Sequence, residues 1–353
     1  MQTPLQLALV TGSTGWLGKR FARLLAARNF DHEALRDLPP NLRLRCLVHT
    51  SESPAELTAM GPHVEVMTGD LRDPSDCARF VEGAASATLF HTAGVIHPQK
   101  VKDFYRINVD GTRNLLDAAE KAGVRRAVVV SSNSPIGCNP FPEHLFDESS
   151  PYNPYMNYGR SKVKMEAAVK EIEVRGKLET VIVRPPWFYG PDQPPRQTQF
   201  FTMIRQGKGP IVGSGCNMRS MVYIDNLCQG MMLAALTERA HGQIYWIADL
   251  RPYSMNEILD TVEQLLADEF KIPVKYKRLR LPGFASEIAL LADKTIQGLG
   301  LYQMQIHVLS EMNKNIACSV AKAQRELDYK PTVALEEGMR RSIAWCIQEG
   351  IQI

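Results

Sequence analysis

Several features that would point to a particular kind of partner are absent from this sequence. Its 41 lysines and arginines nearly balance its 38 aspartates and glutamates, which leaves a formal net charge of +3 over 353 residues. A protein whose main partner is nucleic acid or an anionic membrane usually carries a larger basic excess. Neither partner is therefore indicated by the composition, and 44% hydrophobic residues are ample for a large core.

Paired cysteines are absent as well. The cysteines are odd in number, scattered, and never in C-x-x-C spacing, so neither a disulfide framework nor a zinc site is expected. The pattern predicts buried or unreactive thiols in a reducing compartment, and hence a cytoplasmic protein that binds no metal. The seven positions are Cys46, Cys77, Cys138, Cys216, Cys228, Cys318 and Cys346.

Long hydrophobic runs are also missing. The first residues, "MQTPLQLALVTG", have no basic lead and read as a first strand rather than as a secretory peptide. No stretch approaches the ~20 apolar residues that cross a bilayer. The most apolar later segment, "FASEIALLADKTIQGLGLYQM", contains Glu287, Asp293 and Lys294. It is expected to be a helix of a soluble domain, and a membrane-facing role is less favoured.

The first half of the chain does contain a regular alternation of apolar, β-branched runs with amphipathic segments. Strands are expected at 5–10, 42–48, 64–67, 87–90, 127–130 and 180–183, and helices at 17–28, 54–60, 74–81, 101–122 and 158–175. Continuous apolar strands separated by helices indicate a parallel sheet buried on both faces. The predicted class is α/β, a doubly wound Rossmann domain over residues 1–184, to which residues 222–248 return.

After residue 183 the pattern changes. The stretch "RPPWFYGPDQPPRQ" has five prolines in fourteen residues, and proline is excluded from helix interiors and central strands. We expect an ordered loop leaving the sheet here. Beyond it, strands are expected near Ile211 and in "GQIYWIAD", and helices at 199–206, after "SMVYIDNL", and at 255–267, 320–327 and 335–349. Residues 185–353 are expected to form mainly the substrate-binding region, a smaller mixed α/β unit.

A glycine-rich turn, "VTGSTGWLGKR", follows the first strand and opens a helix. Gly12, Gly15 and Gly18 have the spacing G-x-x-G-x-x-G. Glycine permits a tight turn and a close backbone approach, and the helix start offers free N–H groups to a pyrophosphate. Three glycines alone could be mere turn residues. Their position between a strand and a helix favours a dinucleotide site.

The end of the second strand bears on which dinucleotide binds. Such a strand usually ends in a carboxylate that accepts hydrogen bonds from the adenosine ribose. Here "LRLRCLVHTSE" ends at His49, Thr50 and Ser51, and Asp37 precedes the strand. Without a carboxylate to repel a 2′-phosphate, the cofactor is expected to be NAD(P)(H) with a lean to NADP(H).

Four further motifs follow in order: "GDLRD", "HTAG", "VVVSSNSPIG" and "YGRSK". Together with "TGSTGWLG" they resemble the extended short-chain dehydrogenase/reductase superfamily, over essentially the whole chain. That superfamily includes NAD-dependent nucleotide-sugar epimerases and dehydratases, 3β-hydroxysteroid dehydrogenases and dihydroflavonol-type reductases. The last segment, "SVAKAQRELDYKPTVALEEGMRRSIAWC", is similar to the usual ending of its members.

The resemblance implies roles for particular residues. It places Asp70 by the adenine, Asn108 on the nicotinamide side and Pro185 against the nicotinamide. The register of "SSNSPIG" selects Ser132 as the catalytic serine, with Ser131 as the alternative. The implied cofactor-binding set is Gly12, Thr14, Gly15, Trp16, Leu17, Gly18, His49, Asp70, Leu71, Ala93, Gly94, Asn108, Tyr158, Lys162 and Pro185.

Tyr158 and Lys162 stand four positions apart in an expected helix, so they project from the same face. A solvated Tyr/Lys pair would be the simpler interpretation of this motif taken alone. A free tyrosine, with a pKa of ~10, is a poor base at neutral pH. A neighbouring ammonium, joined by the positive nicotinamide of the oxidised cofactor, favours the phenolate and lowers that pKa. The resemblance then makes Tyr158 the general acid/base, Ser132 a donor to the substrate oxygen, and Lys162 a ligand of the nicotinamide ribose.

The loops around this set narrow the reaction. Dehydratases of the superfamily place an acidic pair after the catalytic serine, whereas Asn133 and Ser134 stand here. Sugar epimerases usually carry an asparagine where this chain has Trp187, and an indole suits an apolar or planar substrate better than a diphosphate. Arg219 resembles the residue that clamps the nucleotide phosphate in the sugar enzymes. His97, beside a proline on a loop, is expected to be structural.

The sequence therefore predicts an NAD(P)-dependent dehydrogenase or ketoreductase that acts on a secondary alcohol or ketone of a moderately apolar substrate. Ser134, Trp187 and Arg219 are the expected substrate contacts. A nucleotide-sugar epimerase is the alternative within enzymes, and a non-catalytic dinucleotide-binding regulatory protein is the alternative outside them. The intact Ser132, Tyr158 and Lys162 set argues against the last. By resemblance, the helices that contain Asn108 and Tyr158 would form a homodimer interface.

Overall fold

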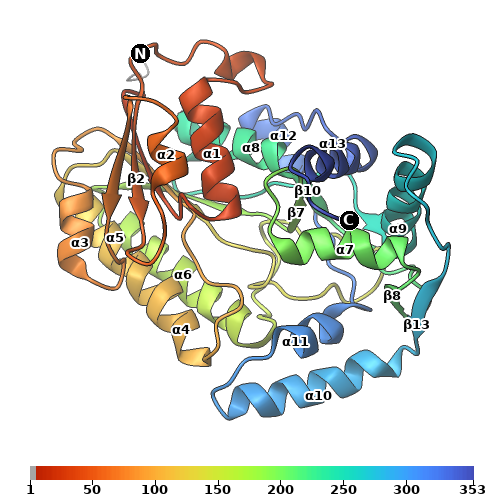
Figure 1. Ribbon diagram of the computed structural model, residues 1–353. Coiled ribbons are helices and arrows are strands. Elements are labelled where there is room, and N and C mark those ends of the chain that lie inside the picture. The colour runs from red at the N-terminus through yellow and green to blue at the C-terminus, as the bar shows by residue number, and fades with distance from the viewer. Residues whose placement is uncertain (1–4) are drawn as a thin grey trace.

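A parallel sheet of seven strands is the largest element of the computed structural model, which describes residues 5–353 (Figure 1). The strand order is β11-β6-β5-β4-β1-β2-β3, and every neighbouring pair is parallel. This is the order of a Rossmann sheet with one added edge strand. The strands are β1 Leu7–Thr11, β2 Arg43–Val48, β3 Val64–Thr68, β4 Thr88–His91, β5 Arg126–Val130, β6 Glu179–Arg184 and β11 Ile244–Trp246.

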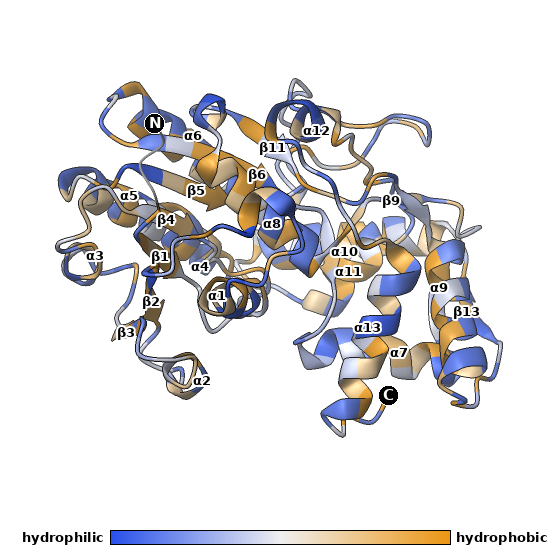
Figure 2. Cartoon of the chain, turned by 90° about the horizontal axis from the view of Figure 1, so that it is seen from above, coloured by the Kyte–Doolittle hydropathy of each residue, from blue (hydrophilic) through white to orange (hydrophobic). Residues whose placement is uncertain are grey.

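Successive side chains of each strand enter two different cores, one on each face of the sheet. In β1, Ala8 and Val10 pack with α1 and α8, while Leu7 and Leu9 pack with α3, α5 and α6. Both faces are thus apolar and covered, and the strands are orange in Figure 2. The prediction of a doubly wound parallel sheet is confirmed. The covering helices are α1 Trp16–Ala27, α3 Pro74–Phe80, α5 Thr112–Lys121, α6 Met156–Val174, α8 Ile224–Leu236 and α12 Ala321–Leu327.

A third core lies beyond the sheet and joins segments from the later half of the chain. Three small sheets surround it, each of two strands. The pairs are β7 Trp187–Tyr189 with β10 Met221–Tyr223, β8 Gly209–Val212 with β13 Arg278–Leu281, and β9 Met218–Arg219 with β12 Tyr253–Ser254. The helices of this core are α7 Pro195–Arg205, α9 Met255–Gln264 and α13 Leu335–Gln348.

Two helices, α10 Phe284–Gly298 and α11 Met304–Glu311, pack against each other at the lower edge of the view in Figure 1. We call this pair the α10–α11 hairpin. Its connecting turn is bonded to the segment before α4 Val101–Tyr105: the amide of Val101 donates to the Gly300 carbonyl at 2.9 Å, and that of Tyr302 donates to the Gln99 carbonyl at 3.2 Å. Within residues 5–353, no helix has both the length and the apolar character needed to cross a bilayer.

The structure differs from the sequence prediction in two places. The proline-rich stretch was expected to be a loop, but it contains β7 and the start of α7. Pro195 occupies the first turn of α7, where a missing N–H costs nothing because that group has no intrahelical partner. The expected helix 101–122 is interrupted by a π-helical turn, Arg106–Gly111. The short helix α2 Ala55–Thr58 agrees with the prediction of 54–60.

Candidate active site

The carboxyl ends of β1, β4 and β5 lie side by side at one edge of the sheet. Thr11 of β1 is opposite His91 of β4, which in turn is opposite Val129 of β5. The crossover direction reverses between β1 and β4, and at such a point the loops diverge and leave a crevice for a ligand. The glycine turn, the "HTAG" loop and the serine loop after β5 all leave the sheet here. The topology thus brings three of the sequence motifs together.

The glycine turn fits a pyrophosphate because it leaves no room for side chains. Gly12 has a φ of +67°, and a Cβ built on it would lie 2.7 Å from the backbone of Ala93. A Cβ on Gly18 would lie 2.1 Å from the carbonyl oxygen of Gly12. No acidic side chain occupies the first turn of α1, so the helix itself supplies no carboxylate that competes for its free N–H groups. The predicted residues Gly12, Gly15, Gly18 and Ala93 therefore form one cradle.

Two other residues of the turn have partners that the sequence did not indicate. The hydroxyl of Thr14 donates to the carboxylate of Glu52, which comes four residues after β2. The indole of Trp16 packs on Phe188 at a centroid distance of 4.8 Å. Its Nε1 donates to the Pro191 carbonyl at 2.7 Å. Trp16 thus holds the turn against the β7 segment, and Phe188 has a packing role.

Asp70, which the resemblance places by the adenine, lies between two basic side chains. It accepts hydrogen bonds from the backbone N–H of Arg72 at 2.9 Å and from its guanidinium, and His49 Nε2 lies 3.5 Å away. These contacts, Arg72 first, lower the pKa of Asp70 to about 2. Leu17 and Leu71 are buried beneath the loops, at 7% and 8% exposure. The structure thus joins His49 and Asp70, as the prediction requires, and adds Arg72.

Asn108 stands inside the π-helical turn and is completely buried. Its Oδ1 accepts from the Val95 amide at 2.8 Å, and its Nδ2 donates to the Val95 carbonyl at 3.0 Å and to Ser161 Oγ at 3.3 Å. A Cβ added at Gly94 would lie 3.2 Å from Asn108 and 3.5 Å from Lys162 Nζ. Asn108 therefore fixes the loop that ends the "HTAG" motif against α6.

The two candidate serines face different partners. Ser131 Oγ donates to Glu166 at 2.5 Å, in a buried cluster where Arg184 also binds Glu166. Ser132 Oγ lies 3.3 Å from Ser134 Oγ and accepts from the Ser134 amide at 3.2 Å. A hydrogen bond from Ser132 also acts on the pKa of Tyr158. The geometry thus places Ser132, rather than Ser131, beside the tyrosine.

Tyr158 and Lys162 lie on one face of α6, but their electrostatics differ from the sequence expectation. Burial raises the pKa of Tyr158 to about 12, and the hydrogen bond with Ser132 opposes this only in part. Lys162 Nζ donates to the Val130 carbonyl at 3.1 Å. Burial lowers the pKa of this lysine to about 8, while the charge of Glu166 acts in the opposite direction. In the protein by itself desolvation therefore dominates the pKa of Tyr158. The expected lowering refers to the complex with the oxidised cofactor and stays a prediction.

Three residues near Tyr158 were not selected from the sequence as site residues. Phe104 lies 5.7 Å from the Tyr158 ring, and Tyr302 lies 5.4 Å from Phe104. The hydroxyl of Tyr302 is 2.8 Å from Nδ1 of His97. Burial lowers the pKa of His97 to about 4, so this histidine is neutral at physiological pH. Only the spatial arrangement reveals that an aromatic side chain from the turn of the α10–α11 hairpin packs on Phe104, which lies beside Tyr158.

The remaining predicted residues are spread along the β7 and β9 side of the site. Pro185 is buried at the end of β6. Trp187 packs on Phe200 of α7, with ring centroids 5.8 Å apart. Arg219 Nη2 donates to the Glu311 carbonyl at 2.6 Å, whereas its buried Nε has no partner among the described residues. Arg219 therefore keeps a hydrogen-bond donor that a ligand could use.

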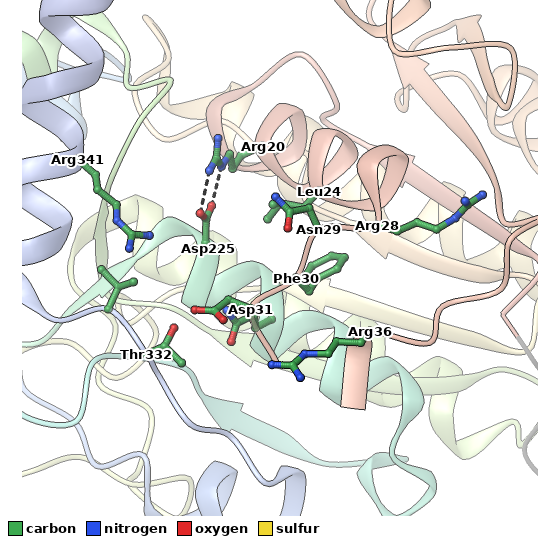
Figure 3. A pocket seen from close by; sticks show the side chains of 12 residues that line it. Arg20, Leu24, Arg28, Asn29, Phe30, Asp31, Arg36, Asp225, Thr332 and Arg341 are labelled. Atoms are coloured by element: carbon green, nitrogen blue, oxygen red, sulfur yellow. Dashed lines mark hydrogen bonds and ion pairs between the residues drawn. The ribbon is translucent and has the colours of Figure 1, made fainter. Parts of the chain in front are cut away.

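A separate hollow of about 540 Å³ lies between α1, α8 and α13 (Figure 3). The ion pair of Arg20 and Asp225, 2.6 Å apart, forms part of its wall, and Arg341 points toward it from α13. None of the predicted site residues lines it. The predicted site residues thus gather at the sheet edge and not in this hollow. In the described part of the chain, no group of His, Cys, Asp and Glu residues could hold a metal ion.

Comparison with known proteins agrees with this geometry. The profile of the NAD dependent epimerase/dehydratase family matches residues 8–248. The uncharacterized protein y4nL of Sinorhizobium fredii is 51% identical over 98% of this chain and 96% of its own length. The 3beta-hydroxysteroid-dehydrogenase/decarboxylase isoform 1 of Arabidopsis thaliana is 29% identical over 95% of this chain and 78% of its own length.

Among solved structures, a double mutant of the dTDP-glucose 4,6-dehydratase DesIV of Streptomyces venezuelae, with NAD bound, superposes with a TM-score of 0.74. It is 25% identical and covers 98% of this chain and 97% of its own. The chain belongs to the NAD dependent epimerase/dehydratase family. It is an enzyme, an oxidoreductase of that family, and the predicted resemblance to the extended short-chain dehydrogenase/reductase superfamily is confirmed.

Proposed function

We propose that this protein transfers a hydride between a nicotinamide cofactor and a secondary alcohol or ketone of a moderately apolar substrate. The observation that carries this proposal is the aromatic enclosure of Tyr158. Phe104 packs beside its ring, and Tyr302 covers Phe104 from the hairpin. Both are buried, at 0% and 6% exposure. Such walls favour a hydrocarbon framework over a hydroxylated sugar.

The residues around the sheet edge have separate tasks in this reaction. A bound nicotinamide would supply or accept the hydride. The glycine cradle and the N-terminus of α1 would hold the pyrophosphate, and Asn108 keeps the "HTAG" loop in position. Tyr158 donates a proton to the carbonyl oxygen in reduction, and its pKa of about 12 keeps that proton available at neutral pH. Ser132 donates a hydrogen bond to the same oxygen.

Lys162 completes the site by its charge. With a pKa of about 8 it is mainly protonated at pH 7. Its ammonium, fixed by the Val130 carbonyl, favours negative charge on the phenolic oxygen when Tyr158 gives up its proton. Residues 185–353 supply Tyr302, Trp187 and Arg219, and we propose that this part mainly binds the substrate.

Other reactions of the family are less well supported. Asn133 and Ser134 stand where a dehydratase would need acids. The epimerase alternative is favoured by one observation, the partnerless Nε of Arg219, which could bind a phosphate. The Arabidopsis relative is a 3beta-hydroxysteroid-dehydrogenase/decarboxylase, and an apolar alcohol as substrate of this protein agrees with that relationship. A purely regulatory role would leave the set of Ser132, Tyr158 and Lys162 without a purpose.

The structure changes the balance between the two cofactors. The lean to NADP(H) depended on the lack of a carboxylate after β2. Glu52 bonds to Thr14, so a carboxylate does lie at the glycine turn. Asp70 adds a second one near His49. Negative charges here repel a 2′-phosphate, and we therefore propose NAD(H) as the preferred form.

The homodimer expected from the resemblance is also a proposal. The exposed sides of α5 and α6 carry ion pairs, such as Arg113 with Glu171 at 3.0 Å and Arg175 with Asp117 at 2.7 Å. A dimer formed through these helices would be held by polar contacts and weakened by salt. Light scattering at 50 mM and 500 mM salt would test this.

The decisive experiment compares substrate classes on the purified protein. NADH and NADPH oxidation should be followed with apolar cyclic ketones, and the reverse reaction with the matching alcohols. Nucleotide sugars should be tested in parallel for epimerisation and for tightly retained oxidised cofactor. Turnover of apolar ketones with exchangeable NADH would support the proposal. Retained cofactor together with sugar epimerisation would replace it with the epimerase.

A further inference from the structure

Helix α10 has the reverse of the amphipathic pattern expected for the surface of a folded protein. Its inner face is polar: Ser286, Asp293 and Gln297 are buried at 0%, 0% and 4% exposure. Its outer face is apolar. Phe284, Ile288, Leu291 and Leu299 are exposed by 65%, 62%, 68% and 75%. Their spacing of four, three and eight residues puts them on one stripe of the helix.

The inner face is held firmly, so the outer face cannot turn inward at small cost. Asp293 accepts from Gln297 at 2.9 Å and lies 2.7 Å from Nδ1 of His307 on α11. Gln297 Oε1 accepts in turn from Asn157 Nδ2 of α6 at 2.9 Å. Rotating α10 would leave these buried polar groups without partners. The exposed stripe is therefore a fixed property of the fold.

Exposed apolar residues are concentrated in this part of the molecule. Eight of the fifteen large hydrophobic residues exposed in the described chain fall within residues 276–308. They are Tyr276, Leu279, Phe284, Ile288, Leu291, Leu299, Leu301 and Val308. Such a concentration of exposed apolar side chains is typical of a surface that binds something apolar.

The charges next to the stripe are basic. The segment "KIPVKYKRLR", residues 271–280, leads through β13 directly into α10, as Figure 1 shows on the right of the molecule. Lys275, Lys277 and Arg280 are exposed and form no ion pair within residues 5–353. Lys294, on α10 itself, is likewise exposed and unpaired in the described chain.

The acidic residues of this region are neutralised, so the basic charges are not balanced locally. Glu287 pairs with Lys314, and Asp293 is buried against His307. Asp260 and Glu263 both pair with Arg278, the one basic residue of β13 that is engaged in this way. The nearly even charge of the whole sequence conceals this local excess.

We propose that α10 and β13 form a docking face for an anionic lipid surface. The apolar stripe would enter the boundary between headgroups and acyl chains, and the free lysines and Arg280 would meet the anionic headgroups. Tyr276, 62% exposed among these basic residues, suits the same interface. Since Tyr302 connects the hairpin to Phe104 and Tyr158, the docked face would adjoin the covered catalytic tyrosine.

Co-sedimentation with sucrose-loaded vesicles tests this proposal on the full chain. Vesicles of phosphatidylcholine with 30% phosphatidylserine are compared with vesicles of phosphatidylcholine alone. The variant Ile288→Ser/Leu291→Ser removes the stripe, and Lys275→Gln/Lys277→Gln removes two charges. The matched control is Val174→Ser at the end of α6, which removes an apolar residue that is 87% exposed elsewhere. Melting temperatures establish that all variants fold.

The expected result is binding to the phosphatidylserine vesicles that falls at least tenfold in Ile288→Ser/Leu291→Ser and severalfold in Lys275→Gln/Lys277→Gln. Val174→Ser should bind within twofold of the natural protein. Absence of binding by the natural protein, or equal binding to both kinds of vesicle, would overturn the proposal. So would a dimer in size-exclusion chromatography that dissociates only in Ile288→Ser/Leu291→Ser, because a second copy would then cover the stripe.

Discussion

The Rossmann sheet and the α10–α11 hairpin each bury a histidine, and the two histidines have opposite electrostatics. His91, at the end of β4, lies between Thr11 and Thr112, with distances of 2.7 and 2.8 Å. Burial lowers its pKa to about 3. Burial also disfavours the protonated form of His307 on α11. The hydrogen bond and the charge of the acidic neighbours, Asp293 first, outweigh this effect and raise the pKa of His307.

The hydroxyl of Thr112 determines the tautomer of His91. Thr112 donates its proton to the Asn108 carbonyl at 2.8 Å, so His91 Nε2 must donate to Thr112, and Nδ1 accepts from Thr11. A neutral ring satisfies both contacts. The sheet region thus keeps its buried histidine, His91, uncharged. The hairpin instead contains the buried pair of Asp293 and His307, which holds α10 with its apolar side facing outward. The two regions should therefore respond differently to substitution and to pH.

The largest expected effect is a difference in kcat between phenylalanine substitutions at Tyr158 and at Tyr302. Tyr158→Phe removes the proton donor and should lower kcat by about 10³-fold, within the range of general acid–base catalysis. Tyr302→Phe, in the hairpin, should change kcat less than tenfold and act mainly on KM. Steady-state kinetics and a cofactor titration by fluorescence would measure both variants. Full activity of Tyr158→Phe would remove the basis of the proposed mechanism.

A second prediction concerns acid stability through His91. Its folded pKa of about 3 lies below the unfolded value of 6.5, so the unfolded state binds more protons between these values. Stability therefore falls as pH falls below 6.5. Between pH 6.5 and 4.5 the natural protein should lose about 2 kcal/mol relative to His91→Gln. Urea unfolding at several pH values would show this, and His241→Gln, at an exposed position, is the control.

The serine assignment gives a third prediction. Ser132→Ala should lower kcat by about 10²-fold, because it removes a hydrogen bond to the reacting oxygen. Ser131→Ala should leave kcat within threefold and reduce stability instead, since Ser131 Oγ bonds to the buried Glu166. Kinetics and melting temperatures of both variants would distinguish these roles. The opposite result would transfer the catalytic assignment to Ser131.

The smallest expected effect is the pH response of the hairpin. The folded pKa of His307 is raised, so its stabilising contribution is fully present below 6.5 and is lost as pH rises through the folded pKa. The cost of His307→Gln should therefore be larger at pH 5.5 than at pH 9, which is opposite in direction to His91. Hydrogen exchange of residues 284–311 would detect it locally. A cost that is independent of pH would mean that the Asp293–His307 pair is not charged.

The sequence predicted the sheet well because the signals for its strands and for the glycine turn each lie within a few consecutive residues. Apolar runs such as "LALV" and "RAVVV" identify strands, and the glycine spacing is visible in a single turn. Glu52 was missed because its relation to Thr14 arises only when the loops after β1 and β2 meet. The raised pKa of Tyr158 in the protein without cofactor was not foreseen, because sequence spacing shows the lysine but not the extent of burial.

The hairpin was the least predictable region. The helix over α10 was expected, but its apolar residues suggest a buried face, and they are exposed instead. Tyr302 reaches Phe104 through a chain reversal that no periodicity indicates. The short elements α11 and β13 have too few residues for a reliable pattern.

The π-helical turn at 106–111 has one further consequence. From Thr11, hydrogen bonds run through His91 and Thr112 to Asn108, and from there to Ser161, which stands next to Lys162. The end of β1 and helix α6 are thus joined by one continuous chain of hydrogen bonds. We expect a displacement of the loop after β1 to be transmitted along this chain to the helix that carries Tyr158 and Lys162.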